Sequence, residues 1–100
     1  SQDTLAAMAL QADGKIIMVG TSGGDIVLVR YHQDGRLDES FGVYGFVTTN
    51  IIDQNDRAYD VTIQEDGKIL VVGSCAEGIV LLRYNLDGTL DDSFDGDILY

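Results

Sequence analysis

Apolar residues occur in short runs along this chain, and nearly every run is bounded by a turn that contains Asp and Gly. The runs are rich in Val, Ile and Leu, which favour strands because branched side chains pack well on a pleated surface. Helical periodicity is never sustained over the roughly ten residues that a helix requires. The pattern therefore predicts an all-β chain.

The same pattern occurs twice. The segment LQADGKIIMVG at residues 10–20 returns as IQEDGKILVVG at residues 63–73. Aligning the glycines of the two DGK blocks sets an offset of 53 residues, and the register then holds without a gap between residues 4–47 and 57–100. About 18 of these 44 positions are identical. A repeat of this kind indicates a solenoid, a propeller or an array, in which one unit needs neighbours to bury its apolar faces.

Each copy is predicted to form four strands. In the first copy they lie at residues 5–11, 15–19, 25–31 and 45–49, and in the second at residues 58–64, 68–72, 78–84 and 97–100. The first two strands of each copy form a hairpin, in which Gly14 and Gly67 supply the positive φ that the turn needs. Residues 1–53 are expected to be the first repeat and residues 54–100 the second.

The second and third strands of each copy are apolar at consecutive rather than alternate positions. Strands of this type have both faces covered by other parts of a protein. A two-sheet sandwich buries only the inner face of each sheet, whereas a propeller stacks four-stranded sheets around an axis and covers both faces. The sequence favours a β-propeller, with two four-stranded antiparallel blades per chain.

The two copies resemble the repeat unit of the delta-60 repeat family of bacterial tandem repeats. The resemblance covers residues 10–49 and 63–94, and its blocks are DGKI, then IVL and RY, then DGxLDxSF. Two features depart from the family pattern: Ala12 and Glu65 stand where Pro is usual, and the ending SFDGDILY lacks the second glycine of F-G-x-x-G. The resemblance implies a β-propeller-like fold in large secreted or cell-surface proteins, without an established catalytic role.

Two blades cannot close a ring, and an isolated pair would leave apolar strands in water. We therefore predict a cyclic homo-oligomer, in which three or four chains supply about six or eight blades, or else a piece of a longer repeat array. Ser1, in place of an initiator Met, suggests a processed or excised segment.

Charge and cysteine content exclude several classes of function. The formal net charge of −11 argues against nucleic acid as a partner, because a negative surface cannot replace the counterions of a phosphate backbone. Cys75 is the single cysteine, so an intrachain disulfide and a metal site of paired thiolates are excluded. The apolar runs are too short for a membrane-spanning helix, so membrane insertion is not expected.

Two loops with the pattern DGxLDxSF are rich in side-chain oxygen atoms, which are the ligands that calcium prefers. The same residues also fit a structural role, because Asp before Gly stabilises its own turn and Asp and Ser can accept from main-chain amides. No other cofactor is expected. The six calcium candidates are Asp34, Asp38, Ser40, Asp87, Asp91 and Ser93.

Arg30 and Arg83 each stand at the end of an apolar strand and share the parity of its apolar positions. They are expected at the boundary between blades, where a guanidinium can donate to loop carbonyls or pair with the second Asp of the following loop. A second interpretation places them in a ligand cleft with the adjacent rings of Tyr31 and Tyr84, against which a glycan could stack.

Catalysis is not indicated. The single histidine, His32, lies in a turn and has Asn85 as its counterpart, so a Ser-His-Asp triad is not predicted. Our interpretation is a non-catalytic propeller module that acts as a binding or structural scaffold, with a glycan or a protein as its ligand. The alternative is a hydrolase of an extracellular polymer with paired carboxylates in the propeller channel.

Overall fold

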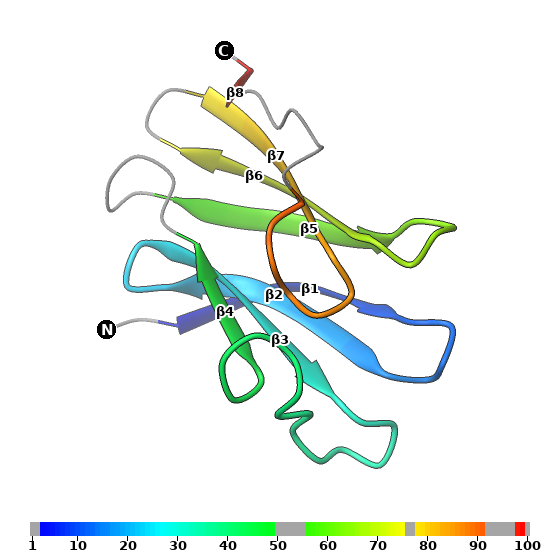
Figure 1. Ribbon diagram of the computed structural model, residues 1–100. Helices are drawn as coiled ribbons and strands as arrows, with labels where there is room; N and C mark the ends of the chain where they lie inside the picture. The colour runs from blue at the N-terminus through cyan, green and yellow to red at the C-terminus, as the bar shows by residue number, and fades with distance from the viewer. Residues whose placement is uncertain (1–2, 50–55, 76–77, 92–97, 100) are drawn as a thin grey trace.

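The protein is built from β-strands in a computed structural model, which describes residues 3–49, 56–75, 78–91 and 98–99 (Figure 1). The described residues contain no helix, and therefore none that could cross a membrane. The all-β prediction is confirmed. The strands are β1 (Asp3–Leu10), β2 (Ile16–Ser22), β3 (Asp25–Tyr31), β4 (Phe46–Thr49), β5 (Arg57–Ile63), β6 (Ile69–Cys75), β7 (Gly78–Tyr84) and β8 (Ile98–Leu99).

The strands form two four-stranded antiparallel sheets, in the orders β1-β2-β3-β4 and β5-β6-β7-β8. We call these sheets blade 1 and blade 2. Figure 1 shows them stacked, with blade 1 in blue to green and blade 2 in green to red. Each predicted repeat holds one blade. The predicted boundary between residues 53 and 54 falls within 50–55, outside the described residues.

The first hairpin of each blade has the predicted turn. Gly14 and Gly67 adopt φ values of 90° and 89°, a region that a residue with a Cβ enters only at a cost. In blade 1, the main-chain N of Gln11 donates to the carbonyl of Lys15 at 2.8 Å, and blade 2 repeats this bond at the same distance. The repeated turn sequence therefore gives the same hairpin twice.

The second strand of each blade is longer than predicted. β2 and β6 end at Ser22 and Cys75 rather than at residues 19 and 72. They continue because the next strand starts after only two residues, so that Ser22 pairs with Asp25 and Cys75 with Gly78. Each first strand also carries a bulge at the same repeat position, between Leu5 and Ala7 and between residues 58 and 60.

The ungapped alignment of the two copies is wrong at the last strand of each blade. In blade 1, Ile26 pairs with Thr49, whereas its counterpart Ile79 pairs with Leu99. The offset between the copies thus falls from 53 to 50 residues at β8. The sequence SFGVYG of blade 1 forms a turn in which Gly42 and Gly45 have positive φ, and the second copy does not contain these glycines. Identical residues along the chain could not show that the connection from β7 to β8 is shorter than the connection from β3 to β4.

Alternation along the strands gives each blade two distinct faces. Cross-strand partners share a face, so the register assigns every strand residue to one side. The front face of blade 1 carries Ile17, Val19, Ile26, Leu28 and Arg30, and the front face of blade 2 their counterparts Leu70, Val72, Ile79, Leu81 and Arg83. The back face of blade 1 carries Met8, Ile16, Met18, Val27, Val29 and Tyr31, and the back face of blade 2 carries Val61, Ile69, Val71, Val80, Leu82 and Tyr84.

The hydrophobic core lies where the front face of blade 1 meets the back face of blade 2, and we call this contact the seam. Nearly all of the fully buried side chains belong to these two faces, and β5 packs across β1 and β2. The contact is close: a Cβ at Gly73 of blade 2 would lie 3.2 Å from Cδ1 of Ile26. Inside this chain each blade therefore has one covered face and one open face.

Candidate functional site

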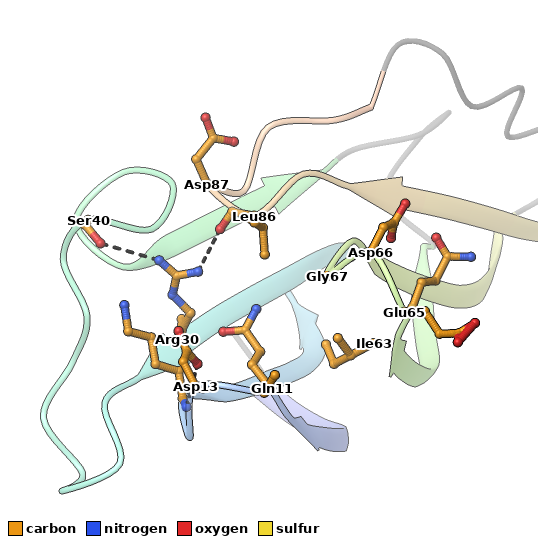
Figure 2. Close-up of a pocket in the computed structure, with 13 residues that line it drawn as sticks. Gln11, Asp13, Arg30, Ser40, Ile63, Glu65, Asp66, Gly67, Leu86 and Asp87 are labelled. Carbon is orange, nitrogen blue, oxygen red and sulfur yellow. Dashed lines mark hydrogen bonds between the residues drawn. The ribbon is translucent and has the colours of Figure 1, made fainter.

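Arg30 is the central polar residue of the seam between the blades. It is buried at the end of β3, and its Nε donates to Oδ2 of Asp38 at 2.9 Å. Its Nη1 donates to the main-chain carbonyl of Leu86 in blade 2 at 2.7 Å (Figure 2). Its guanidinium carbon lies 4.7 Å from the centre of the Phe41 ring. Arg30 therefore ties a loop of its own blade to a turn of the next one, as the sequence predicted.

Asp38 holds this arginine in place. Its carboxylate is buried and also pairs with Nζ of Lys15 at 3.0 Å, while its Oδ1 accepts from the amide and the hydroxyl of Ser40. The Ser40 hydroxyl above all, then Lys15 and Arg30, hold the pKa of Asp38 well below its usual range, although burial opposes this. Asp38 is thus ionised in the folded protein throughout the physiological pH range.

Further hydrogen bonds between described residues join the blades. The Gly42 amide donates to the Asp87 carbonyl at 2.8 Å, and the Ala58 amide donates to the Thr21 hydroxyl at 3.2 Å. The hydroxyls of Thr49 and Tyr84 share a hydrogen bond of 2.6 Å. These bonds fix the angle and the register of blade 2 on blade 1.

A pocket of about 580 Å³ opens between the blades beside Arg30 (Figure 2). We call it the interblade pocket. Gln11 is buried in its wall, and its Oε1 has no hydrogen-bond partner among the described residues. Acidic side chains from both blades also line the pocket, and these are Asp13, Glu65, Asp66 and Asp87.

Blade 2 builds the same cluster on its open front face. Nε of Arg83 donates to Asp91 at 2.9 Å, and Nζ of Lys68 pairs with the same carboxylate at 2.8 Å. The Arg83 side chain is 22% exposed, against 8% for Arg30. The predicted pairing of each arginine with the second Asp of its loop is confirmed in both copies.

The two predicted tyrosines fall on different surfaces. Tyr84 is fully buried on the back face of blade 2, inside the seam. Tyr31 lies on the open back face of blade 1 and is only partly buried. Of the four residues proposed for an interblade cleft, Arg30 and Tyr84 therefore lie between the blades of this chain, whereas Tyr31 and Arg83 lie on its two outer faces.

The calcium candidates among the described residues have structural hydrogen-bond partners. Asp38 and Ser40 bond to each other, whereas Asp34 accepts from the amide and the side chain of Arg36 in an exposed turn. In the second copy, Asp87 accepts from the amide and hydroxyl of Thr89. Within the described part of the chain, no three His, Cys, Asp or Glu side chains are grouped to hold a metal ion. Ser93 lies outside that part, and calcium binding stays a prediction.

Sequence reasoning missed several members of the seam, and these include Lys15, Gln11 and the Leu86 carbonyl. Lys15 and Gln11 belong to the Q-x-D-G-K block that both copies share, and this sharing was the available signal. No sequence signal marks a main-chain carbonyl. His32 is also closer to the cluster than a plain surface residue would be, with Nε2 3.8 Å from Oδ1 of Asp38.

Tyr84 gives a pH-dependent prediction for this seam. Burial raises its pKa to about 12, although the bond to Thr49 opposes the shift. Because the folded value exceeds the unfolded value of about 10, the stabilisation by neutral Tyr84 is complete below pH 10 and lost as the pH rises towards 12. We expect Tyr84→Phe to cost about 0.5–1.5 kcal/mol at pH 7 in denaturant unfolding, and less at pH 11.

Tyr44→Phe is the control for this measurement, since Tyr44 is exposed and should matter at neither pH. A cost of Tyr84→Phe that is equal at pH 7 and pH 11 would contradict the assigned burial of the phenol.

The comparisons with known proteins agree with this architecture. The model of one family matches the chain twice, at residues 11–41 and 64–94, which together are more than half of its length. No curated protein matches the chain. Each matched segment begins at the Gln of the first hairpin and ends at the Phe of the DGxLDxSF loop, so it spans the core of one blade. The chain therefore belongs to the β-propeller family described as a domain of unknown function, DUF5122.

Proposed function

We propose that this chain is a non-catalytic β-propeller module that acts as a binding or structural scaffold. It completes a ring by homo-oligomerisation, or by joining further repeats of a longer array. One observation carries the proposal: the two open faces of the chain are the repeat counterparts of the two faces that already pack together. A surface that is buried in one copy of the repeat is thus available in the other.

The scaffold would offer its ligand the interblade pocket. The carboxylates of Asp13, Asp66 and Asp87 are acceptors there, which suits a ligand that carries hydroxyl or amino groups. A glycan or a polar protein loop has such groups. Each further seam of a ring would add one more pocket, so a repetitive polymer could bind at several of them.

Three carboxylates of the DGxLDxSF loops have the character of structural anions rather than of general acids. The acid in glycoside hydrolysis is a carboxyl group whose pKa is raised, so that it stays protonated near neutral pH. The pKa values of Asp34, Asp38 and Asp87 are all lowered, chiefly by hydrogen bonds from Arg36, Ser40 and Thr89 respectively. The buried carboxylate of the seam thus acts as a structural anion.

We also assign the two repeats to the delta-60 type within this family, on their DGKI and DGxLDxSF blocks. A secreted or cell-surface location follows from that resemblance and is part of the proposal. The net charge of −11 suits a ligand other than nucleic acid.

The molar mass in solution tests the proposal. One chain has a mass of 10.8 kDa, and we expect light scattering to give a mass of three or four chains. A mass of one chain together with a cooperative thermal transition would contradict the assembly. A glycan array measured beside a panel of hydrolase substrates then tests the role: binding without turnover is expected, and turnover lost on substitution of one carboxylate would favour the hydrolase.

A further inference from the structure

We infer that the front face of blade 2 binds the back face of blade 1 of a second copy of this chain, and that Arg83 donates there to the main-chain carbonyl of Gln33. This inference rests on the proposed function and specifies the residues of its interface. Its starting point is the seam inside the chain, which shows how a front face and a back face of this sequence fit together.

Burial differs between repeat counterparts in the way that this interface requires. On the front faces, Ile26 is 0% exposed and its counterpart Ile79 is 52% exposed. On the back faces the buried side chain belongs to the second copy, since Val61 is 6% exposed and its counterpart Met8 is 54% exposed. Apolar side chains are retained at both exposed positions. A front face and a back face that stay open on one chain can be covered together by copies of that chain.

The arginine cluster of blade 2 already has the geometry that works in the seam. Nε of each arginine lies 2.9 Å from its Asp, and Lys15 and Lys68 make the matching second pair. Arg30 donates to the carbonyl of Leu86, and the residue 53 positions before Leu86 is Gln33. The same bond made by Arg83 therefore ends on the carbonyl of Gln33 in the second copy.

The acceptor turn is also preformed on blade 1. Around Leu86, the amide of Asn85 donates to the carbonyl of Thr89 at 2.7 Å, and that of Gly88 donates to Asn85 at 3.0 Å. Around Gln33, the corresponding bonds from His32 and Gly35 measure 2.7 and 2.9 Å. Gly88 packs against Gly42 inside the chain, whereas a Cβ on Gly35 would meet no other described residue within 4 Å. The turn of blade 1 therefore has the same hydrogen bonds as the turn of blade 2, and it is exposed.

Two further seam contacts define the register of the interface. Ile26 lies over Gly73, so Ile79 is placed over Gly20 of the second copy. Thr21 accepts from the amide of Ala58, so Ser74 is placed beside Leu5 of the second copy. Because one face meets a different face, the contact is heterologous and propagates around a ring instead of closing a two-fold dimer.

Engineered disulfides test this register. In a Cys75→Ser background, Ser74→Cys combined with Leu5→Cys should give covalent oligomers under mild oxidation, seen on non-reducing gels. The matched control is Thr21→Cys with Ala58→Cys, which are the same repeat positions inside one chain, and this pair should give a bridged monomer. The control bridge shows that the contact allows disulfide geometry.

The possible outcomes separate the inference from the proposed function. Covalent oligomers from the Ser74 and Leu5 pair support both. If the chain is oligomeric and the control bridge forms, but the Ser74 and Leu5 pair does not link, the front-to-back interface is wrong and assembly itself survives. A folded single chain at all concentrations, without covalent oligomers, overturns both this interface and the homo-oligomer of the proposed function, and leaves the open faces for further repeats of a longer array.

Arg83→Gln gives a second readout at the predicted hydrogen bond. We expect the concentration at which the assembly dissociates to rise about 10-fold or more, as for the loss of a hydrogen bond from a charged donor. Arg57→Gln is the control, because it removes the same charge. Thr4, the counterpart of Arg57, stays exposed beside the seam, so Arg57 is expected to stay exposed beside the new interface. This variant should change the dissociation concentration by less than about twofold. Equal effects of the two variants would show that Arg83 acts only through net charge and would overturn the predicted bond.

Discussion

Asp38→Asn is expected to destabilise the protein by about 3 kcal/mol in denaturant unfolding. The substitution keeps the shape of the side chain but removes the charge that faces Arg30 and Lys15, and Arg30 stays buried in the seam. Removing one partner of a buried ion pair costs about 3–5 kcal/mol, and the lower end applies because the Lys15 side chain reaches solvent. A cost near zero would show that the cluster does not stabilise the seam.

Asp34→Asn is the matched control. It removes the same charge from a turn in which Asp34 and its partner Arg36 are both exposed, so no measurable change is expected. The comparison separates the buried pair from the general effect of one negative charge fewer on an acidic protein.

Asp38→Asn should also change how the stability of the protein responds to acid. Asp38 has a folded pKa far below its unfolded value of about 3.9, so its stabilisation is present above pH 4 and is lost as the pH falls towards the folded value. The wild-type protein should therefore lose stability steeply below pH 4, and Asp38→Asn should lose less over the same range. Parallel curves for the two proteins would contradict the assigned pKa shift.

Leu81→Asp is expected to weaken the assembly by at least about 100-fold and to leave single chains. Leu81 is the counterpart of the fully buried Leu28, and in the proposed interface it lies at the centre of the front face of blade 2. An unpaired carboxylate there would be buried without compensation. Light scattering across a concentration series measures the effect. Tyr44→Asp, on an exposed loop, is the control and should keep the wild-type mass.

Mixing two variants makes this test directional. Val27→Asp disables the back face of blade 1 and leaves the front face of blade 2 intact. Leu81→Asp disables the front face of blade 2 and leaves the back face of blade 1 intact. Each variant alone should be a single chain, and an equimolar mixture should form a complex of one chain of each. A mixture that stays monomeric, while the wild-type protein is oligomeric, would contradict a front-to-back interface.

The sequence predicted the architecture because local rules dominate it. The Asp-Gly turns required glycine at positive φ, and the strands between them were too rich in branched residues and too short for helices. The pairing of Arg30 and Arg83 with an Asp was predicted correctly for a related reason: strand parity fixes which face a residue joins, and each partner Asp follows only eight residues later. These features depend on neighbours in the chain, and both copies express them alike. The predicted position between blades holds inside this chain for Arg30, whereas Arg83 lies on an outer face.

The seam depended on contacts between distant residues, which strand patterns do not encode. Lys15 reaches Asp38 and Arg30 reaches the Leu86 carbonyl only after the sheets form and stack. The shorter path to β8 likewise became visible through pairing and not through identity.

From the sequence alone, this protein is a tandem β repeat whose blades each have two apolar faces and carry an Arg-Asp pair. Only the tertiary structure decided which face of which copy is covered. Ile26 and Ile79 are identical residues in matching strands, and one is buried while the other is half exposed, because stacking order is a property of the folded pair and not of either repeat. Repeat symmetry makes the faces equivalent, and the stacking of blade 2 on blade 1 covers only one face of each.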